Sequence, residues 1–150
     1  MTINEAHTFF EGLKAEAKKK SERKIYEQFQ RVLSGLRNKD LSTQEIQLIE
    51  TELDRLDLIT TPENQKKYFK TALRKFKKYL LDTFELITKG YYAEMGIALG
   101  LNFGILFGII ILSDMERSAG IAVGLAVGMA AGVIIGSRMD ARAMKEGRVI

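Results

Sequence analysis

The sequence predicts an all-α protein in which a cytoplasmic helical bundle precedes a two-helix transmembrane hairpin of the glycine-zipper type. Two long apolar runs occupy residues 91–112 and 119–136, and nine of the 13 glycines recur in them at every fourth position. The preceding 90 residues carry apolar side chains at helical spacing. We therefore expect a helical bundle over residues 1–89, the hairpin over residues 90–137 and a cytoplasmic tail over residues 138–150.

The first half of the bundle is predicted to be helical up to about residue 37. Thr2 and Glu5 have the spacing of a capping box, in which each side chain accepts a hydrogen bond from the backbone N–H of the other residue. The charged stretch 18–24 is either a solvated part of one helix or a short break, and residues 38–40 predict a turn. The apolar stripe comprises Ile3, Ala6, Phe10, Leu13, Ala17, Ile25, Phe29, Val32, Leu33 and Leu36.

A second capping box, Ser42 with Glu45, predicts the start of the next helix, and Leu41 with Ile46 forms the accompanying hydrophobic staple. This helix is expected to end near Leu58. Its buried face comprises Ile46, Ile49, Leu53 and Leu56.

The last helix of the bundle is expected to begin with Thr61 as its cap and Pro62 at its first position. Only residues 88–90 separate it from the first apolar run, so we expect it to continue almost directly into the membrane. Its apolar face comprises Phe69, Ala72, Leu73, Phe76, Leu80, Phe84 and Ile87.

The nine glycines are predicted to mediate helix packing. A glycine inside a helix costs about 1 kcal/mol relative to alanine, but in lipid small residues allow close backbone contact. The alternative, two buried helices of a soluble bundle, is disfavoured because such helices would form poorly in water. The first ladder is Gly96, Gly100, Gly104 and Gly108, and the second is Gly120, Gly124, Gly128, Gly132 and Gly136.

The charges predict that both termini face the cytoplasm. Residues 1–90 hold 18 Lys/Arg and 14 Asp/Glu, and further cations follow the second run, whereas the link between the runs offers only Arg117. The runs of 22 and 18 residues suffice for a hydrocarbon layer of about 30 Å. We expect no signal peptide, because the first 30 residues are charged. The second helix is expected to continue in water towards Asp140 and Ala143.

Asn102 and a second stripe of small residues are candidates for contacts between copies or for lining a pore. On a helical wheel Asn102 lies about 180° from the first glycine ladder. Hydrogen bonding of Asn102 within its own hairpin or to a backbone carbonyl is an equally weighted alternative. The second stripe, which includes Ser118, comprises Ala122, Ala126 and Ala130.

The last bundle helix is strongly basic, which suits contact with anionic lipid headgroups. An ordinary solvated helix face explains the charge equally well. Nucleic-acid binding is the weakest option, because no recognition motif accompanies the charge. The headgroup candidates are Lys66, Lys67, Lys70, Arg74, Lys77 and Lys78.

The side-chain inventory predicts neither an enzyme nor a cofactor or metal site, and no small-molecule substrate. The sequence contains one histidine, His7, and no cysteine, so His-based or Cys-based catalytic and metal sites lack partners. The glycine repeats also lack the Gly-Lys-Ser/Thr ending of a phosphate-binding loop.

The glycine ladders and the C-terminal segments 132–140 and 145–150 resemble small bacterial two-span glycine-zipper membrane proteins, over about the last 60 residues. The resemblance implies a location in the bacterial inner membrane, but no activity. We expect a protein that homo-oligomerises through the hairpin. A pore or membrane-permeabilising assembly controlled by the bundle is the leading interpretation, and a non-conducting anchor whose bundle recruits a cytoplasmic protein partner is the alternative.

Overall fold

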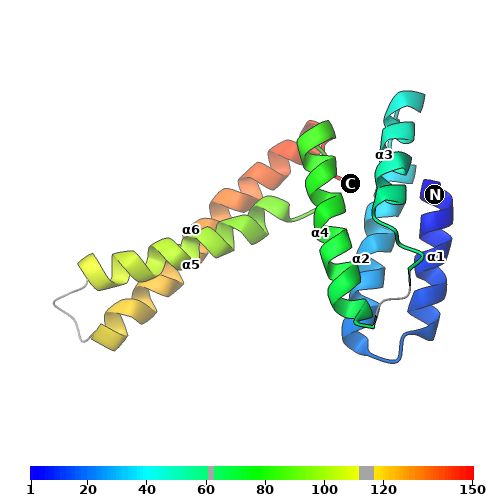
Figure 1. Cartoon of the computed structure of the whole chain (residues 1–150). Coiled ribbons are helices and arrows are strands. Elements are labelled where there is room, and N and C mark those ends of the chain that lie inside the picture. The colour runs from blue at the N-terminus through cyan, green and yellow to red at the C-terminus, as the bar shows by residue number, and fades with distance from the viewer. Residues whose placement is uncertain (61–62, 112–116) are drawn as a thin grey trace. The chain divides into compact units, whose positions relative to one another are not determined.

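The computed structural model describes residues 1–60, 63–111 and 117–150, and these form two compact units (Figure 1). Unit 1 comprises residues 1–88 together with Ile150 and contains four helices, and unit 2 comprises residues 89–149 and contains two. All six elements of the described chain are helices, and the last two are long and apolar. The predicted all-α fold, a bundle followed by a hairpin, is confirmed.

In unit 1, α1 (Ile3–Glu16) and α2 (Lys20–Arg37) form an adjacent pair. The capping box at the start of α1 is present, since Glu5 N–H donates to Thr2 Oγ1 at 3.1 Å and Thr2 N–H to Glu5 Oε2 at 2.8 Å. Hydrogen bonds to the Glu5 carboxylate from the backbone and then from the side chain of Thr2 hold its pKa below the usual value. Of the two interpretations of the stretch 18–24, the structure has the short break, because residues 17–19 separate the two helices.

The third helix, α3 (Thr43–Arg55), begins with the predicted Ser42–Glu45 capping box but ends earlier than expected. Asp57 adopts a positive φ of 47°, and the helix does not reach Leu58. In a continued helix, Leu56 and Leu58 would point about 200° apart. Leaving the helix allows both to be buried, at 8% and 1% exposure.

The fourth helix, α4 (Gln65–Phe84), differs from its prediction at both ends. The predicted cap Thr61 and first residue Pro62 lie outside the described residues, and the described helix begins with Asn64 as its cap. The Asn64 side chain accepts a hydrogen bond from Lys67 N–H at 3.1 Å.

The expectation that α4 runs almost directly into the membrane is wrong. Glu85 ends the helix in the left-handed conformation, with φ of 56°. Leu86 then turns back into the core of unit 1 and is 5% exposed. A continued helix would place Leu86 about 40° outside the buried arc of α4, so the turn is what buries this side chain. Ile150 also packs in unit 1, and its N–H donates to Ile87 O at 2.9 Å.

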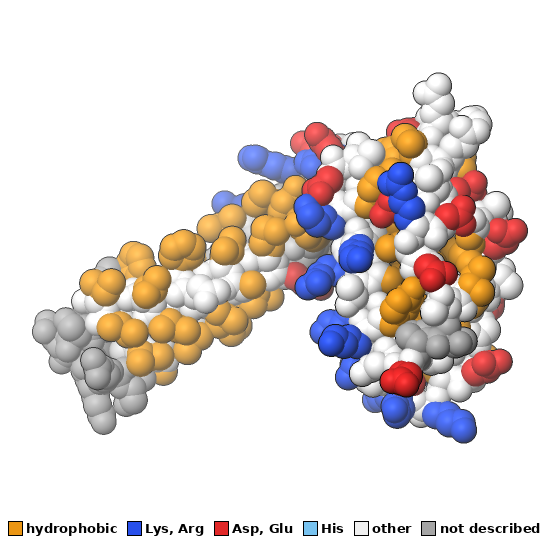
Figure 2. All heavy atoms as spheres, in the orientation of Figure 1, with side chains coloured by type: hydrophobic (Ala, Val, Ile, Leu, Met, Phe, Trp, Pro, Cys, Tyr) orange, Lys and Arg blue, Asp and Glu red, His pale blue; other side chains and the backbone are white. Residues whose placement is uncertain are grey.

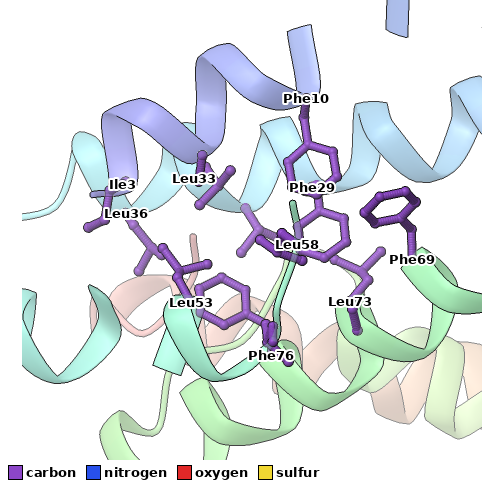
Figure 3. Close-up of a cluster of buried hydrophobic side chains, with 14 of the residues drawn as sticks. Ile3, Phe10, Phe29, Leu33, Leu36, Leu53, Leu58, Phe69, Leu73 and Phe76 are labelled. Atoms are coloured by element: carbon purple, nitrogen blue, oxygen red, sulfur yellow. The ribbon is translucent and has the colours of Figure 1, made fainter. Parts of the chain in front are cut away.

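Aromatic side chains form the centre of the unit 1 core (Figure 3). Phe10 of α1 stacks on Phe29 of α2, with ring centroids 4.1 Å apart, and receives the edge of Phe69 of α4 at 5.6 Å. All three side chains are at most 2% exposed. The stripes predicted from helical spacing therefore meet in one core, with α2 packed against both α1 and α4.

Two tyrosines of α4 bond to the backbone of α3. The Tyr68 hydroxyl donates to Leu56 O or Asp57 O, at 3.0 and 2.7 Å, and so satisfies carbonyls at the end of α3. Desolvation, followed by the nearby Asp57 charge, raises the pKa of Tyr68. Tyr79 makes a longer bond of 3.4 Å to Leu48 O.

Unit 2 consists of α5 (Tyr91–Ile111) and α6 (Arg117–Lys145). Both contain a window that is long and apolar enough to cross a membrane, of which only 11% and 22% is buried inside the protein. A core helix of a soluble protein would be mostly buried, whereas apolar side chains cover the outside of this hairpin (Figure 2). Most of the predicted polar link falls on residues 112–116, outside the described residues. As expected, α6 continues past Asp140 and Ala143.

Replacing Tyr68 with Phe should destabilise unit 1 by about 1–2 kcal/mol, because carbonyls at the end of α3 lose their side-chain donor. Hydrogen exchange of peptides from residues 43–58, measured on the full-length protein, should speed up accordingly. The matched variant Tyr79→Phe removes a weaker bond and should have a smaller effect. Equal effects of the two variants would contradict this role of Tyr68.

Candidate functional site: the glycine-lined hairpin

A seam of bare backbone joins α5 to α6. A Cβ atom placed on Gly100 would lie 2.1 Å from the carbonyl oxygen of Gly128, and one placed on Gly128 would lie 2.1 Å from that of Gly100. Such distances leave no space for even a methyl group. The same opposition repeats along the antiparallel helices, where the pairs are Gly96–Gly132, Gly100–Gly128, Gly104–Gly124 and Gly108–Gly120.

All nine glycines of the ladders lie between the two helices of a single chain. Gly136 has no glycine opposite it and instead meets the carbonyl oxygen of Tyr92, 2.3 Å from its Cβ position. Along the seam, a Cα hydrogen of eight of these glycines points at a carbonyl oxygen of the other helix, and such Cα–H···O contacts contribute about 0.5–1 kcal/mol each. The ladders therefore close the hairpin, and any contact between copies must use other surfaces.

The edges of the hairpin that face away from the seam carry Asn102 on α5 and the alanine stripe on α6. Asn102, Ala122, Ala126 and Ala130 are all exposed. The pairs Gly100–Gly128 and Gly104–Gly124 place Asn102 and Ala126 at the same level along the hairpin, on opposite outer edges.

The Asn102 amide is only partly satisfied within its own chain. Its Nδ2 donates to Ala98 O at 2.7 Å, which corresponds to the backbone-carbonyl alternative. The described residues provide no other hydrogen bond for this amide. A second N–H and the Oδ1 acceptor are left on an apolar surface near the middle of α5.

The broad face on one side of the seam is hollowed into an apolar groove of about 400 Å³. Its floor is the glycine seam, and its walls include Phe103, Phe107, Val123 and Val127. The two phenylalanines are each 61% exposed. This surface suits lipid chains and offers no polar group to water.

Asp140 closes the open end of the hairpin, a role that we did not predict. Its two carboxylate oxygens accept hydrogen bonds from Tyr92 N–H and Ala93 N–H, both at 3.0 Å. Both N–H groups lie in the first turn of α5 and therefore have no carbonyl partner within the helix. The helix dipole also favours a negative charge at this position. An acidic side chain one turn beyond Gly136 on the glycine face was the signal in the sequence.

Arg148 extends this polar cluster at the end of the hairpin. Its guanidinium pairs with Glu146, with Nε 2.7 Å from Oε2, and also bonds to the side chain of Tyr92. The hydrogen bond to Glu146, and then that to Tyr92, raise the pKa of Arg148. The end of unit 2 that adjoins unit 1 in the chain is thus polar, whereas its middle is apolar.

The headgroup candidates on α4 lie on the surface of unit 1. Lys66, Lys67, Lys70, Arg74 and Lys78 are exposed and Lys77 is partly exposed. Lys78 Nζ lies 2.6 Å from Asp82 Oδ2, the acidic residue of α4. The aromatic residues interleaved with these cations point inward, towards the core or the α3 backbone.

Replacing Gly128 with Leu should force α5 and α6 apart, because the side chain would occupy the position of Gly100 O. Overpacking of this kind costs about 1–3 kcal/mol or more. Spin labels at Leu99→Cys and Met129→Cys, both exposed, should report a longer distance in bilayers when the protein is diluted with unlabelled chains. The control Ala126→Leu adds bulk on the outer edge and should leave this distance unchanged. An unchanged distance in Gly128→Leu would rule out the seam.

Replacing Asp140 with Ala should weaken the start of α5 by about 1–2 kcal/mol, the usual cost of losing a helix cap. The amide protons of Tyr92 and Ala93 should then exchange faster in NMR spectra. Asp140→Asn keeps one acceptor and should be intermediate. If Asp140→Asn and Asp140→Ala both left these exchange rates unchanged, the Asp140 carboxylate would not be the cap of α5.

Among the described residues, no group of three or more His, Cys, Asp or Glu side chains could hold a metal ion. Comparison of the chain with known proteins finds no matching family model, no matching curated protein and no matching solved structure.

Proposed function

We propose that this protein is a two-span membrane protein that associates with copies of itself along the hairpin edges and thereby gathers its helical bundles on one patch of membrane. The exposed, half-satisfied amide of Asn102 is the observation that carries the proposal. The resemblance of the chain to two-span glycine-zipper proteins favours a location in the bacterial inner membrane. The cations that flank both spans favour an orientation with both termini in the cytoplasm.

The cost of an unpaired amide in hydrocarbon provides the driving force. Polar groups that lack partners in the membrane core cost several kcal/mol. An interhelical hydrogen bond in a membrane contributes about 0.5–2 kcal/mol. Since the glycine seam occupies the opposite side of α5, Asn102 can reach such a partner only on another molecule or in water.

The alanine edge of α6 is the surface that best fits this amide. Ala126 lies at the depth of Asn102, and its small neighbours Ala122 and Ala130 allow a second helix to approach closely. A carbonyl on that edge has a lone pair free to accept from Asn102 Nδ2. We therefore propose head-to-tail association, with the α5 edge of one copy on the α6 edge of the next.

This arrangement favours the non-conducting anchor over the pore. In a head-to-tail ring the edges are buried in contacts, and the broad faces of the hairpins line the lumen. The groove face has walls of Phe and Val, and the opposite face carries Ile97, Leu101 and Leu125. A lumen lined by these side chains has no polar groups with which to hydrate ions.

As an anchor, the protein would present unit 1 to a cytoplasmic partner in several copies. Unit 1 has an open recess beside α1 that suits a protein partner. Phe9 and Leu13 line it together with Ile59, which is 71% exposed.

Asn102→Leu and Ala126→Leu should each lower the mass of the complex, measured by light scattering in detergent. Phe103→Leu, on the broad face, should leave the mass unchanged. Reconstituted protein should pass no ions beyond the leak of empty liposomes. An unaltered mass in both edge variants would overturn the edge assignment, and single-channel currents would favour the pore.

Cysteine cross-linking tests the head-to-tail geometry directly, since the chain has no native cysteine. A mixture of Leu106→Cys and Ala122→Cys chains, which keep Asn102 and carry their cysteines at one level on the two edges, should form disulfide-linked dimers upon oxidation. If instead Leu106→Cys chains cross-linked only to one another, the contact would be a symmetric α5–α5 pair.

A further inference from the structure

One face of α4 carries a continuous stripe of positive charge. With about 100° per residue, six cations fall within an arc of about 120°. We call this surface the basic stripe; it comprises Lys66, Lys67, Lys70, Arg74, Lys77 and Lys78. Figure 2 shows Lys and Arg side chains along the edge of the bundle where α4 lies.

The charges of unit 1 are distributed unevenly between its helices. α4 contains seven Lys/Arg and only one acidic residue, Asp82, whereas α3 contains four acidic residues and only one cation, Arg55. The bundle is therefore electrically polar, and a negatively charged surface would attract α4 and repel α3.

The basic stripe has almost no apolar component of its own. Phe69 and Phe76 are at most 2% exposed in the core, and Tyr68 and Tyr79 bond to the α3 backbone. The apolar side of α4 is thus committed to unit 1 and could enter a bilayer only if the bundle unfolded. Any contact made by the stripe with a membrane must be electrostatic and remain at the level of the headgroups.

The chain itself holds the stripe near a membrane surface. Leu86 belongs to the unit 1 core, and α5 begins at Tyr91, so five residue steps of at most about 18 Å separate the bundle core from the span. Such a short tether gives the stripe a high effective concentration at the bilayer.

We infer that the basic stripe binds the phosphate headgroups of anionic lipids in the membrane that holds the hairpin, with the acidic α3 directed away from it. The tether favours lipid over nucleic acid, because the membrane is always within reach. The inference depends on insertion of the hairpin, but not on association between copies.

Single fluorescent probes on the full-length protein test this orientation, again because no native cysteine interferes. One probe is placed in the stripe at Lys70→Cys and a matched probe on α3 at Gln47→Cys, both exposed positions. The protein is reconstituted into liposomes that carry a quencher on the lipid headgroup. With phosphatidylglycerol present, quenching should be several-fold stronger at position 70 than at position 47. The difference should disappear in pure phosphatidylcholine and in about 1 M salt, where the Debye length is about 3 Å.

Charge reversal separates the stripe from the overall charge of the protein. Lys66→Glu with Arg74→Glu should reduce quenching at position 70 to its level in phosphatidylcholine. The control Arg31→Glu with Arg37→Glu changes the net charge equally at exposed positions of α2 and should preserve the quenching. All four side chains are exposed, and circular dichroism checks that both variants stay folded.

Equal quenching at positions 47 and 70, or an equal loss with both double variants, would overturn the inference. Release of the position-70 probe from the bilayer by added duplex RNA or DNA at constant salt would assign the stripe to nucleic acid instead. If the basic stripe does not bind lipid headgroups, the mass of the complex in detergent is not affected. This result can therefore be distinguished from a failure of association along the hairpin edges.

Discussion

The structure of the hairpin depends on one steric constraint: along the seam, the backbones of two helices touch with no room for a side chain. Each glycine pair places a carbonyl oxygen where a Cβ atom would stand. This contact fixes which sides of α5 and α6 face each other, and therefore which sides face outward. The exposed amide of Asn102, the alanine edge and the phenylalanine-walled groove all owe their positions to it.

Each of the two units is stabilised internally by a different kind of packing. In unit 1, large aromatic rings such as Phe10 and Phe29 fill a core from which water is excluded, and burial of apolar area drives folding. In a bilayer this drive is absent, because lipid tails are as apolar as leucine. Unit 2 instead relies on many close backbone contacts and on the Asp140 carboxylate that caps the start of α5.

Features encoded by neighbouring residues could be predicted from the sequence, whereas those that depend on distant partners could not. Both capping boxes and the helical stripes follow from short spacings, and the glycine ladders follow from a strict repeat. The helix ends near Leu58 and Leu86 were missed, because burial of these two side chains outweighs local helix preference. Asp140 was missed because its partners, the first amides of α5, lie 48 and 47 residues away. Likewise, the sequence alone did not establish that the two ladders face each other within one chain, because this depends on the antiparallel alignment of α5 and α6.

A strict repeat leaves that register ambiguous. Sliding α6 along α5 by four residues would again oppose four glycine pairs, now Gly96–Gly136, Gly100–Gly132, Gly104–Gly128 and Gly108–Gly124. The seam alone therefore cannot distinguish two alignments about 6 Å apart. In the shifted alignment Asp140 would stand beside Tyr92 rather than beyond it, out of line with the amides that point along the helix axis. The Asp140 carboxylate thus selects one of the two alignments that the repetitive glycine contact allows.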